Sequence, residues 1–283
     1  GVVSVPLTLS IGDDEYLDGV DITLEAYVGK LVTTAGAPRS SQPAVKDFAA
    51  LYERLLEYRE GVVSIHIAGA MSGTVESARR AARQVDPERV CVIDGCSVSV
   101  GTGLLVRAVG RAIAEGVSLA GVVALAEQVK RDITIFGAIR SLDFAVRGGR
   151  VSPRLARAIK TLRLTALIAF DEKGRARKAG VALGFARAID RIVKKAVRYG
   201  GGRQAEMMVV HSGDQATAER VAARLRAAVD GDVPVVRAGP VLTTHVGLGT
   251  ISIAVRRAPS ALPAAASSTP ASRPSSRPPM SHP

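Results

Sequence analysis

The feature that most constrains the fold of this chain is a strand–turn–helix pattern in its first third. Residues 62–67 form an apolar run rich in β-branched side chains, which is typical of a buried strand. Ser72, Gly73 and Thr74 follow, and apolar residues then recur at helical spacing as far as Val85. We expect Ser72 or Gly73 to cap this helix. The free N–H groups of such a helix start suit a carboxylate or a phosphate, although capping alone also explains these residues.

Strands and helices alternate on both sides of this pattern. A helix predicted from Pro43 to Glu60 precedes it. After it the sequence predicts a strand at 90–93, helices at 101–114 and 119–130, and a strand at 133–136. Such alternation favours a parallel sheet flanked by helices. For the start of the chain we expect a strand at 2–9, turns at 13–15 and 18–19, a helix from Asp21 to Lys30, and a loop at 35–43.

The pattern changes from about residue 147 onward. Two strands, at 164–170 and 175–182, are joined by a hairpin-like turn. Around them we expect helices at 141–147, 154–162, 186–199 and 216–229, and strands at 206–211 and 233–239. The segment 242–255 is predicted to be a loop that enters a last strand. These elements predict a second α/β domain with a mixed sheet.

The predicted domain organisation has three parts. An N-terminal α/β domain covers 1–146, a C-terminal mixed α/β domain covers 147–257, and a tail covers 258–283. The tail holds seven of the chain's fourteen prolines together with Ala and Ser, a composition typical of disorder.

Composition narrows the classes of function. A formal net charge of +12 raises nucleic acid or a membrane surface as partners. The basic residues are interspersed, without a run of five and without interleaved aromatics, so we expect no nucleic acid and at most transient membrane contact. Cys91 and Cys96 are predicted to be reduced thiols of a cytosolic protein, and no His or Cys spacing indicates a metal. Gly101, Thr102 and Gly103 lack the third glycine of a dinucleotide-binding loop, so no cofactor is expected.

Five short motifs follow one another along the chain. They are Ser40-Ser41-Gln42-Pro43, Met71-Ser72-Gly73-Thr74, Val92-Ile93-Asp94, Gly148-Gly149-Arg150 and His245-Val246-Gly247-Leu248-Gly249. In this order and at these spacings the chain resembles the DegV family, whose members carry T-S-Q-P, L-S-G-T, V-I-D-S, G-G-R and H-x-G-P-G. The resemblance runs from Val2 to about Arg257.

The resemblance implies a two-domain α/β protein that holds one long-chain fatty acid in a tunnel between its domains. It further implies the binding subunit of a bacterial fatty acid kinase, in phospholipid metabolism. Such a subunit is cytoplasmic, has no cofactor, and presents the acyl carboxylate to a separate ATP-dependent kinase without catalysing the reaction itself. The family's carboxylate-binding residues map here onto Ser40, Ser72 and His245, with Gly73, Thr74 and Gly247 in supporting places.

The chain departs from the family pattern at several positions. The family's first strand is missing upstream of Gly1, so we expect part of the first sheet to be absent. Leu248 replaces the proline of the last motif. Leu183 stands where an arginine often precedes a long helix, a change that bears on a kinase partner. Arg187 could substitute for that arginine, because one helical turn separates it from Leu183 if the helix extends so far back.

Two other classes of function stay open at this point. Without a kinase partner, the chain would be a stand-alone lipid carrier. A hydrolase-type enzyme on the same fold would pair Ser72 or Ser40 with His245 as nucleophile and base.

Overall fold

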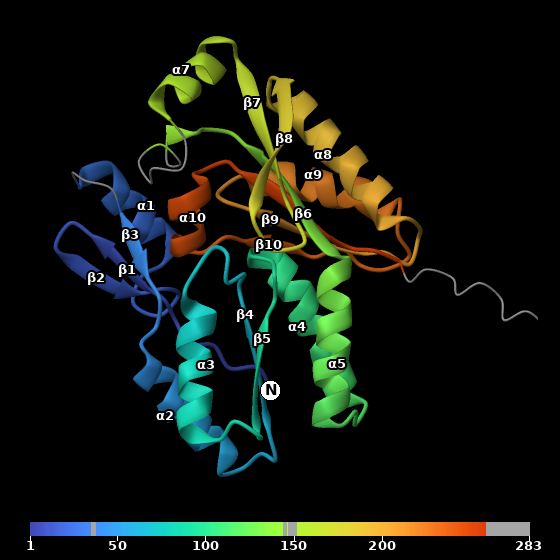
Figure 1. Cartoon of the computed structure of the whole chain (residues 1–283). Coiled ribbons are helices and arrows are strands. Elements are labelled where there is room, and N and C mark those ends of the chain that lie inside the picture. Colours follow the sequence, from blue (N-terminus) through green and yellow to red (C-terminus); the bar gives the residue numbers. More distant parts are fainter. Residues whose placement is uncertain (35–37, 144–145, 147–151, 259–283) are drawn as a thin grey trace, which may run out of the picture.

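The computed structural model describes residues 1–34, 38–143, 146 and 152–258. Three sheets organise these residues (Figure 1). A six-stranded mixed sheet occupies the upper half of the view, a parallel pair of strands lies below it, and a small three-stranded sheet lies to the left. The predicted α/β class with a parallel and a mixed sheet is confirmed. Four predicted features fall wholly or partly outside the described residues, namely the loop at 35–43, the helix at 141–147, the motif Gly148-Gly149-Arg150 and the tail.

The three-stranded sheet is built by the first 41 residues. Its strands are β1 (Thr8–Ile11), β2 (Asp14–Leu17) and β3 (Arg39–Ser41), antiparallel in the order β2-β1-β3, with α1 (Leu24–Thr33) beside them. Side chains alternate along β1, so Leu9 and Ile11 are buried against Tyr27 of α1. Gly12, at φ +60°, makes the tight turn into β2.

Several expectations for this region are wrong. The strand predicted at 2–9 begins only at Thr8, the turn predicted at 13–15 runs into β2, and the loop predicted at 35–43 contains β3. Strands of three or four residues are too short to show a side-chain period, which is why the sequence did not reveal them. Thr23 rather than Asp21 caps α1, since its Oγ1 accepts from the Ala26 N–H.

The parallel pair consists of β4 (Val62–His66) and β5 (Val90–Asp94). Its helices are α2 (Val45–Leu56) and α3 (Thr74–Val85) on one side, and α4 (Ser99–Ala114) and α5 (Leu119–Val129) with its short 3₁₀ extension (Lys130–Asp132) on the other (Figure 1). Val62 packs in the cluster of α2 and α3, whereas the next residue, Val63, packs in the cluster of α4 and α5. Because both faces are covered, the strands are mainly apolar, and the predicted strand–turn–helix pattern is confirmed.

The six-stranded sheet has the order β10-β9-β11-β6-β7-β8. Its members are β6 (Ile133–Ile139), β7 (Leu164–Phe170), β8 (Ala176–Leu183), β9 (Glu206–His211), β10 (Val235–Arg237) and β11 (Ile251–Arg256). The pairing of β9 with β10 is parallel and the other four pairings are antiparallel. The helices α7 (Pro153–Thr161), α8 (Phe185–Gly200) and α9 (Gln215–Arg226) belong to this half. Side chains of α8 and α9 share a buried cluster with one face of the sheet.

Helix α4 packs against both the parallel pair and the six-stranded sheet. Leu104 and Leu105 lie in one buried cluster with Ile93 of β5 and with Ile135 and Val210 of the six-stranded sheet. The strand β6 is predicted from the N-terminal alternation, but it pairs with β11 and β7 in the mixed sheet. Its type is therefore confirmed and its expected sheet is wrong, because pairing between distant strands leaves no local pattern. The domain boundary at 146/147 stays a prediction.

The closing segment contains a helix where the sequence predicts a loop. This helix, α10 (Pro240–Val246), has Pro240 in its first turn and ends at Gly247, whose φ is +77°. Proline is favoured at helix starts, so Gly239 followed by Pro240 is a local sequence signal for the start of this helix. The helix lies between the three-stranded and six-stranded sheets (Figure 1). Among the described helices, none has the length and apolar content that crossing a lipid bilayer requires.

Candidate ligand-binding site

Two residues named from the sequence meet across the fold. The Ser40 Oγ in β3 lies 2.9 Å from the His245 Nε2 in α10, although 205 positions separate them in the chain. Both side chains are half-buried, so the pair is partly shielded from water and still reachable. A hydroxyl beside an imidazole offers hydrogen-bond donors without a fixed charge.

Ser72 lies at the start of α3. Its Oγ is 2.8 Å from the Thr74 Oγ1 and accepts from the Thr74 N–H at 3.3 Å. The N-cap residue of α3 is Gly73, one of the two expected candidates, and it supplies no side-chain acceptor. The Thr74 N–H is bonded to Ser72 and the Glu76 N–H to the Gly73 carbonyl, so the Val75 N–H is the donor that the first turn of α3 leaves to a ligand at its positive end.

A third residue, which the sequence analysis did not assign to the site, ties these two places together. The Gln42 Nε2 donates to the Ser77 Oγ of α3 at 2.9 Å. A Cβ atom on Gly73 would lie 2.1 Å from the Gln42 Oε1, so a larger residue there would displace the Gln42 amide. Because Gln42 follows Ser40 by two residues, this contact fastens the end of β3 to the start of α3. The signal was present as the third residue of the Ser40-Ser41-Gln42-Pro43 motif.

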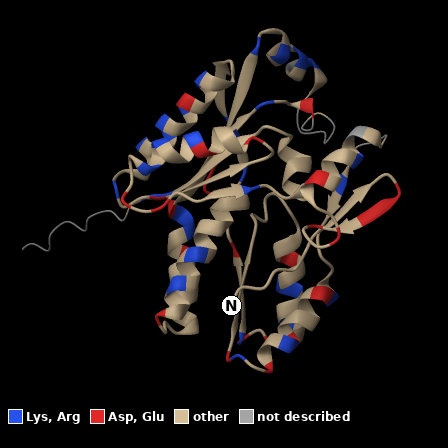
Figure 2. Cartoon of the chain, turned by 180° about the vertical axis from the view of Figure 1, so that it is seen from behind, with Lys and Arg blue, Asp and Glu red and all other residues tan. Residues whose placement is uncertain are grey.

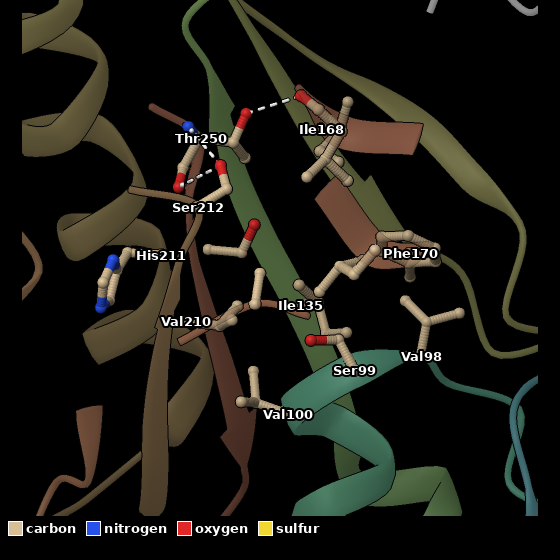
Figure 3. Close-up of a pocket in the computed structure, with 14 residues that line it drawn as sticks. Val98, Ser99, Val100, Ile135, Ile168, Phe170, Val210, His211, Ser212 and Thr250 are labelled. Atoms are coloured by element: carbon tan, nitrogen blue, oxygen red, sulfur yellow. Dashed lines mark hydrogen bonds between the residues drawn. The ribbon is translucent and has the colours of Figure 1, made fainter. Parts of the chain in front are cut away.

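A pocket lies between the six-stranded sheet, the start of α4 and α10 (Figure 3). It contains about 400 Å³ of empty space, its open mouth included. Nine of its fourteen lining residues are apolar, namely Val98, Val100, Ile135, Ile168, Phe170, Val210, Ala238, Leu242 and Val246. Leu242 and Val246 stand one turn apart on α10, so the helix that carries His245 also forms a wall of the pocket.

Two polar residues of the pocket, Ser212 and Thr250, have side chains bonded to the backbone. The Ser212 Oγ donates to the Gly247 carbonyl at 2.5 Å and accepts from the Thr250 N–H at 3.0 Å, which holds the turn after α10. The ring of His211 lies on the opposite side from Ile135 and Phe170 (Figure 3). Burial lowers the pKa of His211, so a neutral ring is favoured there.

The expected relation between Leu183 and Arg187 is wrong. Leu183 is the last residue of β8, and α8 begins only at Phe185, so the two positions do not share a helix face. Gly184, at φ +77°, breaks the chain direction between strand and helix. Arg187 is exposed in the first turn of α8.

The surface around Arg187 is strongly basic, contrary to the expectation of an interspersed charge. Residues 153–198 contain thirteen Lys and Arg and three Asp and Glu, a net +10 of the chain's +12. Figure 2 shows basic residues along α7 and α8. The sequence hid this concentration because no five basic residues are consecutive. It becomes visible once α7, β8 and α8 are brought onto one end of the six-stranded sheet.

The described residues contain no group of three or more His, Cys, Asp or Glu arranged to hold a metal ion. Cys91 and Cys96 are both free and half-buried. Burial raises the pKa of the Cys96 thiol, and the nearby Asp94 carboxylate raises it further. The protonated thiol is therefore favoured, which makes Cys96 a poor nucleophile.

Comparison with known proteins shows similarity over nearly the whole chain. The profile described as "Uncharacterised protein, DegV family" matches residues 1–258. A DegV domain-containing protein of Deinococcus radiodurans is 30% identical over 259 residues, which cover 90% of this chain and 91% of that protein. A solved structure entitled "Fatty Acid Binding of a DegV family Protein from Thermus thermophilus" has a TM-score of 0.81 and 32% identity, covering 90% of this chain and 91% of that one. A DegV family protein from Eubacterium eligens loaded with heptadecanoic acid has a TM-score of 0.80, with 20% identity and coverage of 90% and 92%.

Proposed function

The chain belongs to the DegV family, and on that premise we propose that it binds one long-chain fatty acid and presents the carboxylate to a partner protein. The observation that carries the proposal is the double role of α10. Leu242 and Val246 line a mainly apolar pocket, and His245 on the same helix meets the Ser40 hydroxyl. A pocket of this kind beside a hydroxyl and an imidazole suits an amphiphile with a small polar head. The fatty acids named for the Thermus thermophilus and Eubacterium eligens proteins support the same ligand class.

The carboxylate is held by Ser40, Ser72 and His245. A carboxylate that leaves water needs hydrogen-bond donors, and two hydroxyls with one imidazole N–H supply them. The first turn of α3 adds the Val75 N–H and a partial positive charge. Because the hydroxyls are neutral, the carboxylate keeps the electron density that attack on a phosphoryl donor requires. Three residues have supporting roles: Gly73 admits Gln42, Thr74 begins α3, and Gly247 ends α10.

The acyl chain occupies the apolar pocket. Each methylene that it buries contributes about 0.8 kcal/mol. The lining of this pocket is mainly apolar, which suits a hydrocarbon chain. The residues at its far side, such as Ile168 and Phe170, are apolar and contribute no charge to a hydrocarbon chain.

Direct binding measurements test this proposal. Native mass spectrometry of protein purified from a bacterial host should show one bound mass of a fatty acid. A displacement titration should then give an affinity for a fatty acid at least about tenfold higher than for the alcohol of equal chain length, because the alcohol lacks the charged acceptor. Equal affinity for both would contradict the carboxylate site. Release of acid from an acyl ester would favour the hydrolase alternative.

Presentation to an ATP-dependent kinase in the bacterial cytoplasm is the second part of the proposal. Its support is the basic surface around Arg187, since guanidinium groups bind phosphate bidentately and steer an acidic partner. Arg187→Ala should lower acyl-phosphate formation with the host's kinase and leave fatty-acid affinity unchanged.

Arg220→Ala is the matched control for that experiment, because Arg220 is equally exposed but lies on α9. Equal losses of turnover in both variants would show a general charge effect. A loss of lipid affinity in Arg187→Ala would assign Arg187 to the pocket. If no kinase of the host gives turnover with the unaltered protein, the chain is a lipid carrier alone.

A further inference from the structure

The helix α10 is fastened to the three-stranded sheet unit, residues 8–41, by contacts outside the proposed carboxylate site. Its N-cap residue is Gly239, which has no side chain to accept from the free N–H groups of the first turn. Pro240 has no N–H, so the first exposed donor is the Val241 N–H. That group donates to the Asp18 Oδ1 at 3.3 Å, from a residue 223 positions earlier in the chain. The Asp18 carboxylate thus accepts the hydrogen bond that an N-cap side chain would ordinarily accept.

A second contact lies one turn further along α10. The Tyr27 hydroxyl is 2.5 Å from the Thr244 Oγ1, and the Tyr27 side chain is fully buried. The Thr244 hydroxyl donates its single proton to the Pro240 carbonyl at 2.9 Å. It can therefore only accept from Tyr27, which fixes the Tyr27 O–H as the donor. The donor and the acceptor of this bond are therefore fixed, and the bond restrains the rotation of α10 about its own axis.

The faces of α10 make that rotation important. Val241 and Thr244 face the three-stranded unit, where Val241 packs beside its buried core. Leu242 and Val246 face the pocket. At about 100° per residue, His245 projects between these two faces. A small rotation of the helix would carry the imidazole away from the Ser40 hydroxyl.

We propose that Asp18 and Tyr27 are positioning residues for ligand binding: they clamp α10 so that His245 is held against Ser40 before the ligand arrives. The inference rests on the proposed fatty-acid site and adds residues that do not touch the ligand. An ion pair between Glu25 of α1 and Arg237 joins the same unit to β10, the strand that precedes α10. The three-stranded unit therefore influences ligand binding through α10. Loss of its contacts with α10 would weaken carboxylate binding at the polar end of the site.

The first experiment compares two tyrosines that each lose only a hydroxyl. Tyr27→Phe removes the donor to Thr244. Tyr52→Phe is the matched control, because Tyr52 is also almost fully buried and its hydroxyl is 2.7 Å from the Ser64 Oγ, in a cluster that does not include α10. Tyr27→Phe should lower fatty-acid affinity about threefold to tenfold, the worth of one well-placed hydrogen bond, while Tyr52→Phe leaves it unchanged.

The second readout does not need the ligand. In ligand-free protein the ¹⁵N signal of the His245 Nε2 reports its hydrogen bond to Ser40, and a His245→Gln spectrum identifies the signal. Tyr27→Phe should move this signal in the same direction as Ser40→Ala, and Tyr52→Phe should not. In a Ser40→Ala background Tyr27→Phe should cost no further affinity, because the pair it positions is already broken.

The third arm tests the cap. Asp18→Ala should lower fatty-acid affinity, and Asp18→Asn should restore it, because the amide oxygen still accepts from the Val241 N–H. Unmoved Nε2 signals in Tyr27→Phe and Asp18→Ala, or equal effects of Tyr27→Phe and Tyr52→Phe, overturn the clamp. If the unaltered protein binds no fatty acid, the proposed function fails, and the Nε2 signals still decide whether the clamp exists.

Discussion

The proposed site has two polar places, one at the start of α3 and one at α10, and they depend on the fold in different ways. At the start of α3, Ser72 is bonded to Thr74, two residues away, within one strand–turn–helix unit. At α10, His245 meets Ser40 only because a three-stranded sheet carries β3 across the molecule. The first place depends on local chain geometry, and the second depends on the whole fold. A site that combines both can lose half of its contacts through changes far from the ligand.

A titratable group stands near each place, His66 buried and Asp18 half-buried, and the two respond oppositely to acid. His66 ends β4, and burial lowers its pKa to about 4. Asp18 caps α10, and burial raises its pKa. The unfolded chain therefore takes up a proton at His66 before the folded protein does, so acid destabilises the α3 side. For Asp18 the folded protein holds its proton more firmly, so acid favours the folded form on the α10 side.

The largest expected effect is acid destabilisation through His66. Between pH 7 and pH 4.5 the free energy of unfolding should fall by about 2–3 kcal/mol, because the histidine stays neutral in the fold and protonates near pH 6.5 when unfolded. Urea unfolding of the unaltered protein and of His66→Gln at both pH values measures it. If the free energy of unfolding of His66→Gln falls by the same amount, groups other than His66 cause the effect. The proposed difference in acid response between the α3 and α10 sides would then be wrong.

The next largest effect concerns the long-range place. His245→Ala should weaken fatty-acid binding about tenfold to a hundredfold, since a donor to a charged head is worth roughly 1.5–3 kcal/mol. Displacement of a fluorescent fatty acid gives the affinity, and a melting curve shows whether the fold is kept. Unchanged affinity in a folded variant would remove His245 from the site.

The smallest effect is expected at the local place. Ser72→Ala should weaken binding only about threefold to tenfold, because Thr74 and the Val75 N–H of α3 remain to receive the carboxylate. Ser72→Thr, which keeps the hydroxyl, serves as the control in the same titration. If Ser72→Ala lowers fatty-acid affinity more than His245→Ala does, the expected order is reversed, and the start of α3 contributes more to binding than α10.

The sequence was informative wherever structure is local. The apolar run of β4 and the helical spacing of α3 were sufficient to place Ser72, and the DegV resemblance identified Ser40 and His245. The sequence did not reveal the short strands β2 and β3 or the seven-residue helix α10, because such lengths carry too few residues for a period. Asp18 and Tyr27 carried no signal at all, since their role is defined by partners more than 200 residues away.

The packing of helix α4 against two sheets has a consequence for how the chain unfolds. Its leucines are buried jointly against β5 and the six-stranded sheet, so exposing either sheet would strip apolar area from the other. Unfolding of one half alone would therefore leave the other half without part of its own core. We expect the whole described chain to melt as one cooperative unit, with a calorimetric enthalpy equal to the van't Hoff enthalpy.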